Sequence, residues 1–367
     1  MNRYLLVSLI LISSCTKVME SETEMHPLPD RLPYNEENSV MISKSAVNYT
    51  NNQLQNFLKS PNHENYREIA LNLRGDEIIT ELENGNLIFA GKSIHQILLY
   101  DLLNEKTHVI ASSGRGPGDV LRINDVVIDG DDLLVSMEDG RLSKFECNGE
   151  GCEYISTILL EANLLSVSKN EEFTYLMRAS GLFGGDQSTV ESYDFNRIMV
   201  LRENKVINTF GEGYDFTNRH MMRINLDKGL VAVTPNNSVF ASYKRFPFIY
   251  QYDTNGKLTQ KYQIDEFIQG YDLYFTTNSR LRNLGDDYSE IVDLVMTDNG
   301  LLVIVQHSKN RKIESQQFVW DVSYDYYETD FNGSEWKYLG SSIGHMYHIL
   351  NDKIFYTNSD KNILILL

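Results

Sequence analysis

The amino-acid sequence predicts an all-β fold in which six similar antiparallel sheets follow one another along the chain. A polar turn followed by an apolar strand recurs six times, as NGNLIFAG, GDDLLVSM, NEEFTYLM, NNSVFASY, DNGLLVIV and NDKIFYTN, starting at Asn84, Gly130, Asn170, Asn236, Asp298 and Asn351. The residues before these strands are 46, 40, 66, 62 and 53 positions apart, a spacing typical of β-propeller blades. Helical periodicity is almost absent. A β-sandwich gives no reason for six recurring units, so we expect a six-bladed β-propeller with four-stranded antiparallel blades.

Each repeat continues into a return strand that ends in a turn of Asn, Gly or Asp, as in QILLYDLLNEK and FIYQYDTNGK. These residues tolerate the positive φ angles of tight hairpins. The segments Asp253–Gly256 and Asp330–Gly333 have this composition but lack the ligand spacing and terminal Glu of a calcium loop. We therefore interpret both segments as turns.

The last repeat ends with NILILL and lacks an outer strand, whereas REIALNL (Arg67 to Leu73) precedes the first repeat and has no sheet of its own. Pairing the two segments would close the ring and remove exposed sheet edges. We expect the propeller to span residues 67–367, with the N-terminal and C-terminal strands closing it.

The first residues have the layout of a secretory signal. Arg3 supplies a positive charge, Tyr4 to Ile12 form an apolar stretch, and Ser13 and Ser14 are small. The stretch is shorter than the roughly 20 residues that span a bilayer. We predict a signal peptide at residues 1–14.

The tetrapeptide Ile12 to Cys15 resembles the lipobox of bacterial lipoproteins. The resemblance implies that Cys15 is diacylated and becomes the mature N-terminus; the alternative is an ordinary signal peptide followed by an unrelated cysteine. Residues 15–66 are polar, with Pro27, Pro29 and Pro33, and we interpret them as the lipidated N-terminus and a tether.

Charge limits the partners. The chain has 33 Lys and Arg against 51 Asp and Glu, a formal net charge of −18. Such a surface repels phosphate backbones and anionic lipid headgroups. We therefore expect no nucleic-acid partner and membrane attachment through the lipid anchor alone.

Cys147 and Cys152 flank Asn-Gly-Glu-Gly, which predicts a hairpin turn that brings the two thiols face to face. In an oxidising compartment they can form a disulfide; two reduced thiols near a turn are the alternative. No second cysteine or histidine cluster accompanies them as a metal site would require.

Ser113 to Glu146 read SGRGPGDVLRINDVVIDGDDLLVSMEDGRLSKFE, and this segment resembles an NHL repeat. Gly114, Gly116 and Gly118 match the glycines of that repeat, Asp119 stands where Gln or Glu is usual, and Val120 replaces the usual aromatic residue. With the lipobox, the chain resembles the six-bladed NHL- and TolB-like propeller lipoproteins of Gram-negative bacteria. The resemblance implies a cell-envelope protein that is lipid-anchored, with the outer membrane favoured, and exposed to the periplasm or the cell surface.

Candidate ligand-binding residues lie where propeller loops and inner strands converge. Arg115 is placed on the GRGPG crossing, as an anion contact or as a structural salt bridge. Asp125 and Asp293 each lie seven residues before a strand marker, at equivalent positions of two blades, where they could bind a cation or hold adjacent blades together. Tyr324, Tyr326 and Tyr327 form a cluster that could stack on sugars or peptides, or could be ordinary strand residues.

Two functions remain open at this point. No sequence signature of catalysis is found, which favours a non-enzymatic, extracytoplasmic binding or scaffold module that recognises a protein, peptide or glycan on a propeller face. The alternative is a hydrolase or lyase that uses Asp125 and Asp293 with a divalent ion in the central channel. We predict no cofactor for the first function, and Ca²⁺ or another divalent cation for the second.

Overall fold

The protein is described by a computed structural model. The residues described are 39–44, 66–69, 77–91, 95–148, 151–179, 196–213, 228–268, 287–312, 318–343, 346–350, 353–357 and 363–366. The predicted signal peptide and Cys15 lie outside these ranges. Within them, no helix has the length and apolar character needed to cross a membrane.

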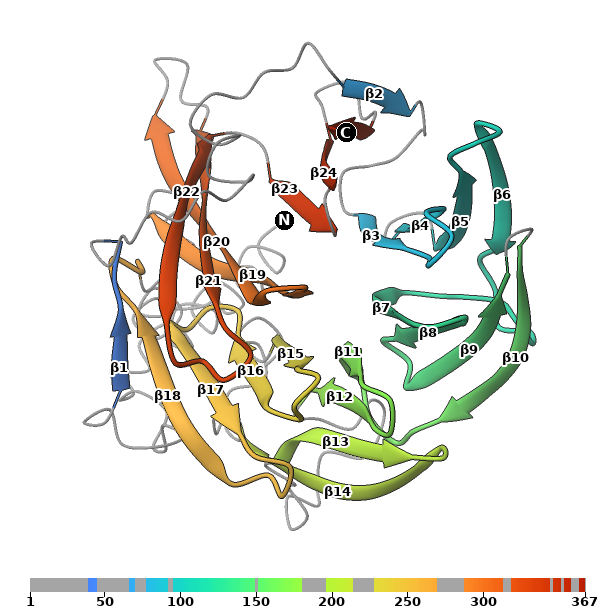
Figure 1. Ribbon diagram of the computed structural model, residues 1–367, viewed down its shortest axis with the longest axis horizontal. Helices are drawn as coiled ribbons and strands as arrows, with labels where there is room; N and C mark the ends of the chain where they lie inside the picture. Colours follow the sequence, from blue (N-terminus) through green and yellow to red (C-terminus); the bar gives the residue numbers. More distant parts are fainter. Residues whose placement is uncertain are drawn as a thin grey trace, which may run out of the picture.

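Every regular element of the described residues is a β-strand (Figure 1). In chain order the strands are β1 (Ser39–Ile42), β2 (Tyr66–Ile69), β3 (Glu77–Glu81), β4 (Leu87–Gly91), β5 (Gln96–Asp101), β6 (Lys106–Ala111), β7 (Ile123–Asp129), β8 (Asp132–Met137), β9 (Arg141–Cys147), β10 (Cys152–Leu159), β11 (Leu164–Lys169), β12 (Thr174–Arg178), β13 (Asn196–Arg202), β14 (Lys205–Glu212), β15 (Gly229–Val233), β16 (Val239–Tyr243), β17 (Phe248–Tyr252), β18 (Leu258–Ile264), β19 (Tyr288–Thr297), β20 (Gly300–Lys312), β21 (Phe318–Thr329), β22 (Trp336–Ile343), β23 (Tyr347–Leu350), β24 (Lys353–Thr357) and β25 (Ile363–Leu366).

Apart from β1, these strands form antiparallel sheets arranged as the blades of a β-propeller (Figure 1). Five sheets have four strands, in the orders β3-β4-β5-β6, β7-β8-β9-β10, β11-β12-β13-β14, β19-β20-β21-β22 and β23-β24-β25-β2; one sheet has five, in the order β15-β16-β17-β18-β1. The innermost strands contact one another in the cyclic order β3, β7, β11, β15, β19 and β23, with β23 again next to β3. The predictions of an all-β propeller and of four-stranded antiparallel blades are confirmed.

Strands β2 and β25, which lie far apart along the chain, meet in one sheet. β2 pairs with β25 in antiparallel register, with Tyr66 opposite Leu366 and Ile69 opposite Ile363. Ile69 is buried beside Phe355 of the same sheet and Phe89 of the next one along the chain.

One strand was not expected. β1 lies in the range that we interpreted as a polar tether, yet it adds to the outer edge of β18, parallel to it. The sheet that contains β15 therefore has five strands, which corrects the expectation of four for this blade. Within the described residues, none of the other sheets gains a strand in this way.

The apolar side chains of the core pack between neighbouring sheets. The middle strands β4, β16 and β17 and the inner strand β15 are buried along their whole length, and their sequences are rich in the β-branched and aromatic residues that suit such positions. One apolar cluster joins Ile88, Ala90 and Leu99 to Val126, Leu133 and Phe145 of the next sheet. The core is therefore a series of interfaces between blades rather than one central mass.

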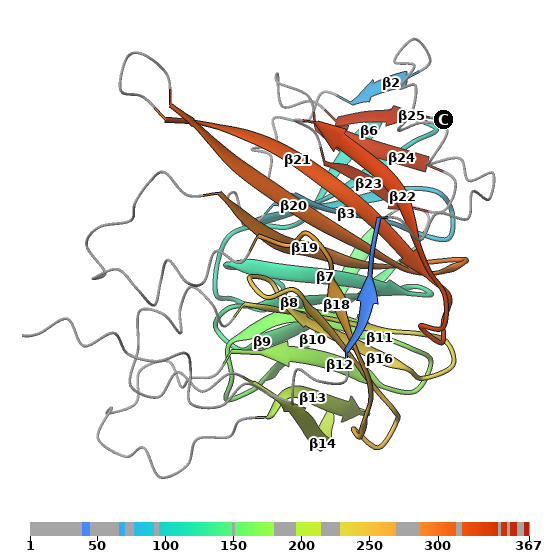
Figure 2. The same ribbon diagram turned by 90° about the vertical axis from the view of Figure 1, so that its left-hand side faces the viewer.

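The two faces of the propeller differ. We call the face on which the chain passes from one sheet to the next the connection face; it carries residues 112–122 and 160–163. We call the opposite face, with the tight turns at 130–131, 203–204 and 253–257, the turn face. The hairpin of β20 and β21 extends beyond the neighbouring strands on one side of the molecule (Figure 2).

Candidate functional site

The GRGPG segment crosses from the outer strand β6 to the inner strand β7 on the connection face. Gly114 donates a backbone hydrogen bond to the Val120 carbonyl at 3.0 Å, and Gly116 donates one to Asp119 Oδ2 at 2.9 Å. A Cβ atom on Gly114 would collide with the Asp119 side chain, so only glycine allows this approach. Gly118 has a φ of 78°. The glycines thus make the open crossing that the sequence predicts.

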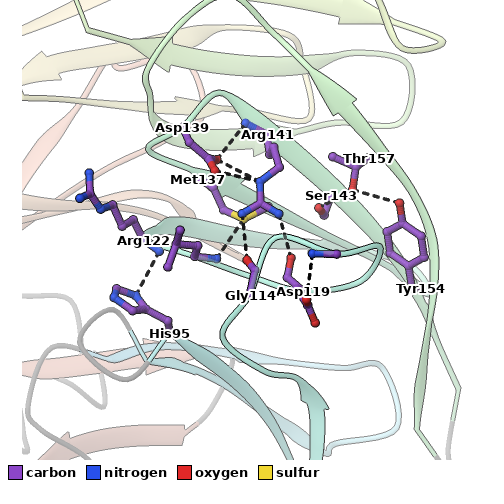
Figure 3. A network of polar contacts seen from close by, with 12 residues as sticks. His95, Gly114, Asp119, Arg122, Met137, Asp139, Arg141, Ser143, Tyr154 and Thr157 are labelled. Atoms are coloured by element: carbon purple, nitrogen blue, oxygen red, sulfur yellow. Dashed lines mark hydrogen bonds and ion pairs between the residues drawn. The ribbon is translucent and has the colours of Figure 1, made fainter. Parts of the chain in front are cut away.

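Arg141, at the start of β9, holds this crossing in place (Figure 3). Its Nη1 and Nη2 atoms donate to the carbonyls of Asp119 and Gly114 at 3.2 and 3.3 Å. Its Nε atom lies 3.0 Å from Asp139 Oδ2. Sequence analysis did not single out Arg141. The arginine that the sequence predicted on this crossing, Arg115, lies on it and is exposed.

Asp125 lies at a β-bulge near the start of β7, and its carboxylate is used within the protein. Oδ2 accepts hydrogen bonds from the Ser166 hydroxyl at 2.8 Å and the Val167 amide at 3.0 Å, both on the neighbouring inner strand β11. Oδ1 accepts one from the Val126 amide at 2.9 Å. The structure therefore favours the alternative in which Asp125 joins adjacent blades.

Asp293 occupies the equivalent place on β19. A bulge precedes it, as at Asp125, and its Oδ1 accepts a hydrogen bond from the next amide, Leu294, at 2.9 Å. The equivalence predicted from spacing is therefore present. However, β7 and β19 are separated by two inner strands in the ring, so the two carboxylates do not share one site. In the described part of the chain, no three His, Cys, Asp or Glu side chains are grouped as metal ligands would be.

The tyrosine cluster on β21 lies largely inside the protein. Tyr326 and Tyr327 are completely buried and belong to apolar clusters on opposite faces of the sheet. Tyr324 is half-buried against the same cluster as Tyr326. The interpretation of Tyr326 and Tyr327 as an exposed stacking surface is wrong, because neighbouring blades cover both faces of this strand.

A buried Ser–His–Asp series crosses the same sheet. Ser289 Oγ lies 2.7 Å from His307 Nδ1, and His307 Nε2 lies 2.7 Å from Asp325 Oδ2. The Ile268 amide donates to Ser289 Oγ at 2.9 Å. Both ring nitrogens of His307 are therefore engaged, one with the serine hydroxyl and the other with the carboxylate.

These residue types occur in hydrolases, but here Ser289 is wholly buried and its oxygen already accepts a backbone hydrogen bond. A nucleophile must reach its substrate, so the series holds three strands together. Sequence analysis missed it because the residues lie on β19, β20 and β21, each 18 positions from the next. The equal spacing is the only signal, and it has meaning only once the strand register is known.

Asp325 collects four donors. Tyr338 and Ser341 donate to Oδ1 at 3.2 and 2.7 Å, while His307 and Lys44 bind Oδ2, the latter with an ion pair of 2.8 Å. Burial raises the pKa of this carboxyl, but the hydrogen bonds from His307, Lys44 and Ser341 outweigh burial and hold it well below its ordinary value. Asp325 is therefore held as an anion, and Lys44 supplies a cation that pairs with it.

Cys147 and Cys152 are joined by a disulfide across the hairpin from β9 to β10. Cys147 is buried among the apolar side chains between the first two sheets. Of the alternatives left open by the sequence, the structure has the bridged one. Cys15, the predicted lipidation site, lies outside the described residues.

Comparison with known proteins extends the fold assignment. No family model matches the chain, and no curated protein matches it in sequence. A solved structure from Bacteroides fragilis NCTC 9343, provisionally described as an exported protein, is 10% identical, with a TM-score of 0.56 over 89% of this chain and 98% of that one. The WD40 repeats of RRP9 are 10% identical, with a TM-score of 0.52 over 82% and 97% of the two chains.

A streptogramin B lyase is also 10% identical, with a TM-score of 0.49 over 83% of this chain and 99% of that one. At such low identity a structural likeness shows the fold alone. The strand topology and the first two structural neighbours agree on the conclusion that this chain is a β-propeller.

Proposed function

We propose that the protein is a lipid-anchored, extracytoplasmic binding or scaffold module of the NHL- and TolB-like propeller type. Its ligand is a protein, peptide or glycan that contacts the connection face. One contrast carries this proposal. Asp125, Ser289, His307 and Asp325 are engaged in hydrogen bonds within the protein, whereas Arg115 is exposed on a crossing that Arg141 fixes in place. An exposed arginine on a backbone crossing held by hydrogen bonds suits contact with a partner, because arginine is enriched among the residues that carry binding energy.

We further propose that the six sheets are six blades of a closed ring, with β2 completing the last blade. The cyclic contacts of the inner strands and the pairing of β2 with β25 support this arrangement. Arg67 and Ile365 are opposite each other in that pairing. A variant with cysteine at both positions should form a disulfide under oxidation, seen as a faster-migrating band on a non-reducing gel. Failure to form it, while a pair of cysteines at Ser143 and Thr157 of β9 and β10 does, would count against closure.

The binding function is tested by reversing charge on one face at a time. Arg115→Glu changes the connection face, and Arg202→Glu is the matched control, since Arg202 is an exposed arginine at the end of β13 near the turn face. Both proteins are screened against peptide and glycan arrays. We expect the ligands retained by the parent chain to be lost by Arg115→Glu and kept by Arg202→Glu. Equal retention by both variants would contradict recognition on the connection face.

The anchor is tested separately with Cys15→Ala. We expect this variant to lose palmitate labelling and to leave the membrane fraction. A variant that stays membrane-bound and labelled would contradict the anchor.

The alternative of a divalent-ion enzyme is tested by melting temperatures. The parent, Asp125→Asn and Asp293→Asn are each melted with and without chelator. A chelator effect that both substitutions abolish would favour that alternative.

A further inference from the structure

The outer edge of β18 holds an extended segment of the chain's own N-terminal region. Residues 39–42 lie parallel to β18, in a register that places Ser39 opposite Lys261 and Ile42 opposite Ile264. The Ile42 carbonyl accepts a hydrogen bond from the Asp265 amide at 2.9 Å. An extended segment that adds to a sheet edge is a known mode of peptide recognition, in which backbone bonds give affinity and side-chain pockets give specificity.

One apolar contact fixes the register of this segment. Ile42 is only 2% exposed and packs in the apolar cluster that includes Ile264, Phe267 and Tyr327. The two residues before it are 46% and 51% exposed, Val40 and Met41 respectively. The edge therefore selects one aliphatic side chain and tolerates varied residues before it.

One charged contact follows the apolar one. Two positions after Ile42, Lys44 Nζ lies 2.8 Å from Asp325 Oδ2 and 3.2 Å from Glu266 Oε2. It also lies 5.7 Å from the centre of the Tyr338 ring. Asp325 is 2% exposed, and removing the lysine would leave this buried carboxylate without its ammonium partner. The site therefore favours a cationic side chain at the position of Lys44.

We propose that the edge of β18, together with Asp325, Glu266 and the apolar cluster around Ile264, is a peptide-binding site. Its ligand class is an extended peptide, parallel to β18, with an aliphatic residue followed two positions later by lysine. Residues 39–44 fill the site from within the same chain. This proposal goes beyond recognition on the connection face and does not depend on the lipid anchor.

A segment tethered to its own site has an effective concentration in the millimolar range and excludes weak competitors. The test therefore uses the full chain with Ile42→Asp, which replaces the buried aliphatic side chain and should release residues 39–44 from the site without deleting them. The probe is a fluorescent peptide of residues 37–46 (ENSVMISKSA), and its anisotropy is followed as protein is added. We expect saturable binding to Ile42→Asp and at least 100-fold weaker binding to the parent chain.

Three variant peptides test the recognition pattern. Peptides with Ile42→Asp or Lys44→Met should bind at least 10-fold more weakly than the parent peptide. The matched control, Met41→Asp, introduces the same charge at an exposed position and should bind within about 3-fold of the parent, since the site tolerates varied residues there. Equal affinity of all four peptides for a folded Ile42→Asp chain, or no binding of any, would overturn the proposal.

A second format does not rely on the Ile42→Asp chain being folded. A protease site inserted between residues 50 and 60 lets the parent chain be cut after folding, so that the N-terminal fragment is held only by its contacts. We expect the fragment to dissociate on dilution and to be displaced by the 37–46 peptide but not by its Lys44→Met form. A fragment that the peptide never displaces would overturn the proposal, and exchange between two parent chains into a stable dimer would assign the site to a second copy.

Discussion

Asp125 Oδ2 accepts a 2.8 Å hydrogen bond from the Ser166 hydroxyl, which joins the inner strands of two neighbouring blades. The Ser166 hydroxyl oxygen in turn accepts a hydrogen bond from the Val231 amide of the next inner strand, β15, at 3.4 Å. Three consecutive inner strands, β7, β11 and β15, are therefore linked through side chains. This use of Asp125 requires no bound ion.

Asp125→Ala should destabilise the protein by about 2 kcal/mol, because it leaves a buried hydroxyl and amide without their acceptor. Ser166→Ala should cost about 1 kcal/mol, and the double variant should cost less than the sum, since both remove one shared hydrogen bond. Urea unfolding monitored by circular dichroism measures all three. Strictly additive effects would contradict the pairing of these two side chains.

Gly140 and Gly85 provide a matched pair for the turns, with φ angles of 86° and 84°. A methyl group at Gly140 would meet the carbonyl oxygens of Leu160 and Ala162, whereas at Gly85 the nearest atom is Glu81 Oε1 at 3.8 Å. Gly85→Ala should cost about 1 kcal/mol, for the backbone conformation alone. Gly140→Ala should cost at least about 3 kcal/mol, since it adds a clash with the backbone. Equal losses in urea unfolding would show that the connection at 160–163 adapts to the extra methyl group.

Reduction of the Cys147–Cys152 disulfide should have a modest effect, because the bridge closes a loop of only a few residues. Loop-closure entropy predicts a loss of about 2 kcal/mol. Thermal melts of the parent chain with and without dithiothreitol measure it, and Cys152→Ser is the control that should not respond to the reductant. A loss of all structure on reduction would mean that the bridge organises more than its own hairpin.

Ionisation of the Tyr262 phenol should make the free energy of unfolding depend on pH in the alkaline range. Its hydroxyl lies 2.7 Å from Gln251 Oε1 and 2.9 Å from the carbonyl oxygen of Gly333 in the neighbouring blade. Burial raises the pKa of this phenol to about 12, and the nearby charge of Asp330 adds to the shift. The unfolded chain releases this proton near pH 10, so the stabilising contribution is complete below pH 10 and is lost as the pH rises from 10 to 12.

Tyr262→Phe should therefore be less stable than the parent at pH 8, by about 1 kcal/mol for the lost hydrogen bond. Between pH 10 and 12 it should lose stability less steeply than the parent does. Urea midpoints across this pH range give both quantities. Parallel curves for the two proteins would contradict the assigned shift.

The blade pattern could be predicted from sequence because its signals are local. All six repeated turn–strand segments are the second strands of their sheets. Asp132, Gly300 and Lys353, which we placed just before a strand, are the first residues of β8, β20 and β24, so these strands begin one residue earlier than expected. A polar turn before an apolar strand is set by a few adjacent residues. The strand expected at Arg67 to Leu73 is β2, at Tyr66–Ile69.

The missed features depend on pairings between distant residues. β1 is a four-residue strand in a polar stretch, and its hydrogen bond from Ser39 to Gln263 spans 224 positions. The residues around Ser39 contain no local signal for pairing with β18. The Ser289–His307–Asp325 series likewise needs the register of two long hairpins, and the burial of Tyr326 needs knowledge that both faces of its sheet are covered.

The partnership of β2 with β25 has a consequence for how the molecule is made. Tyr66–Ile69 leaves the ribosome almost 300 residues before Ile363–Leu366, the strand it must find. Contacts between such distant segments form slowly, because a long loop has to be ordered before the contact is gained. Translation can therefore finish the earlier blades while this one waits, and a nascent chain stalled before residue 363 should carry an unpaired β2 that is open to proteases and chaperones.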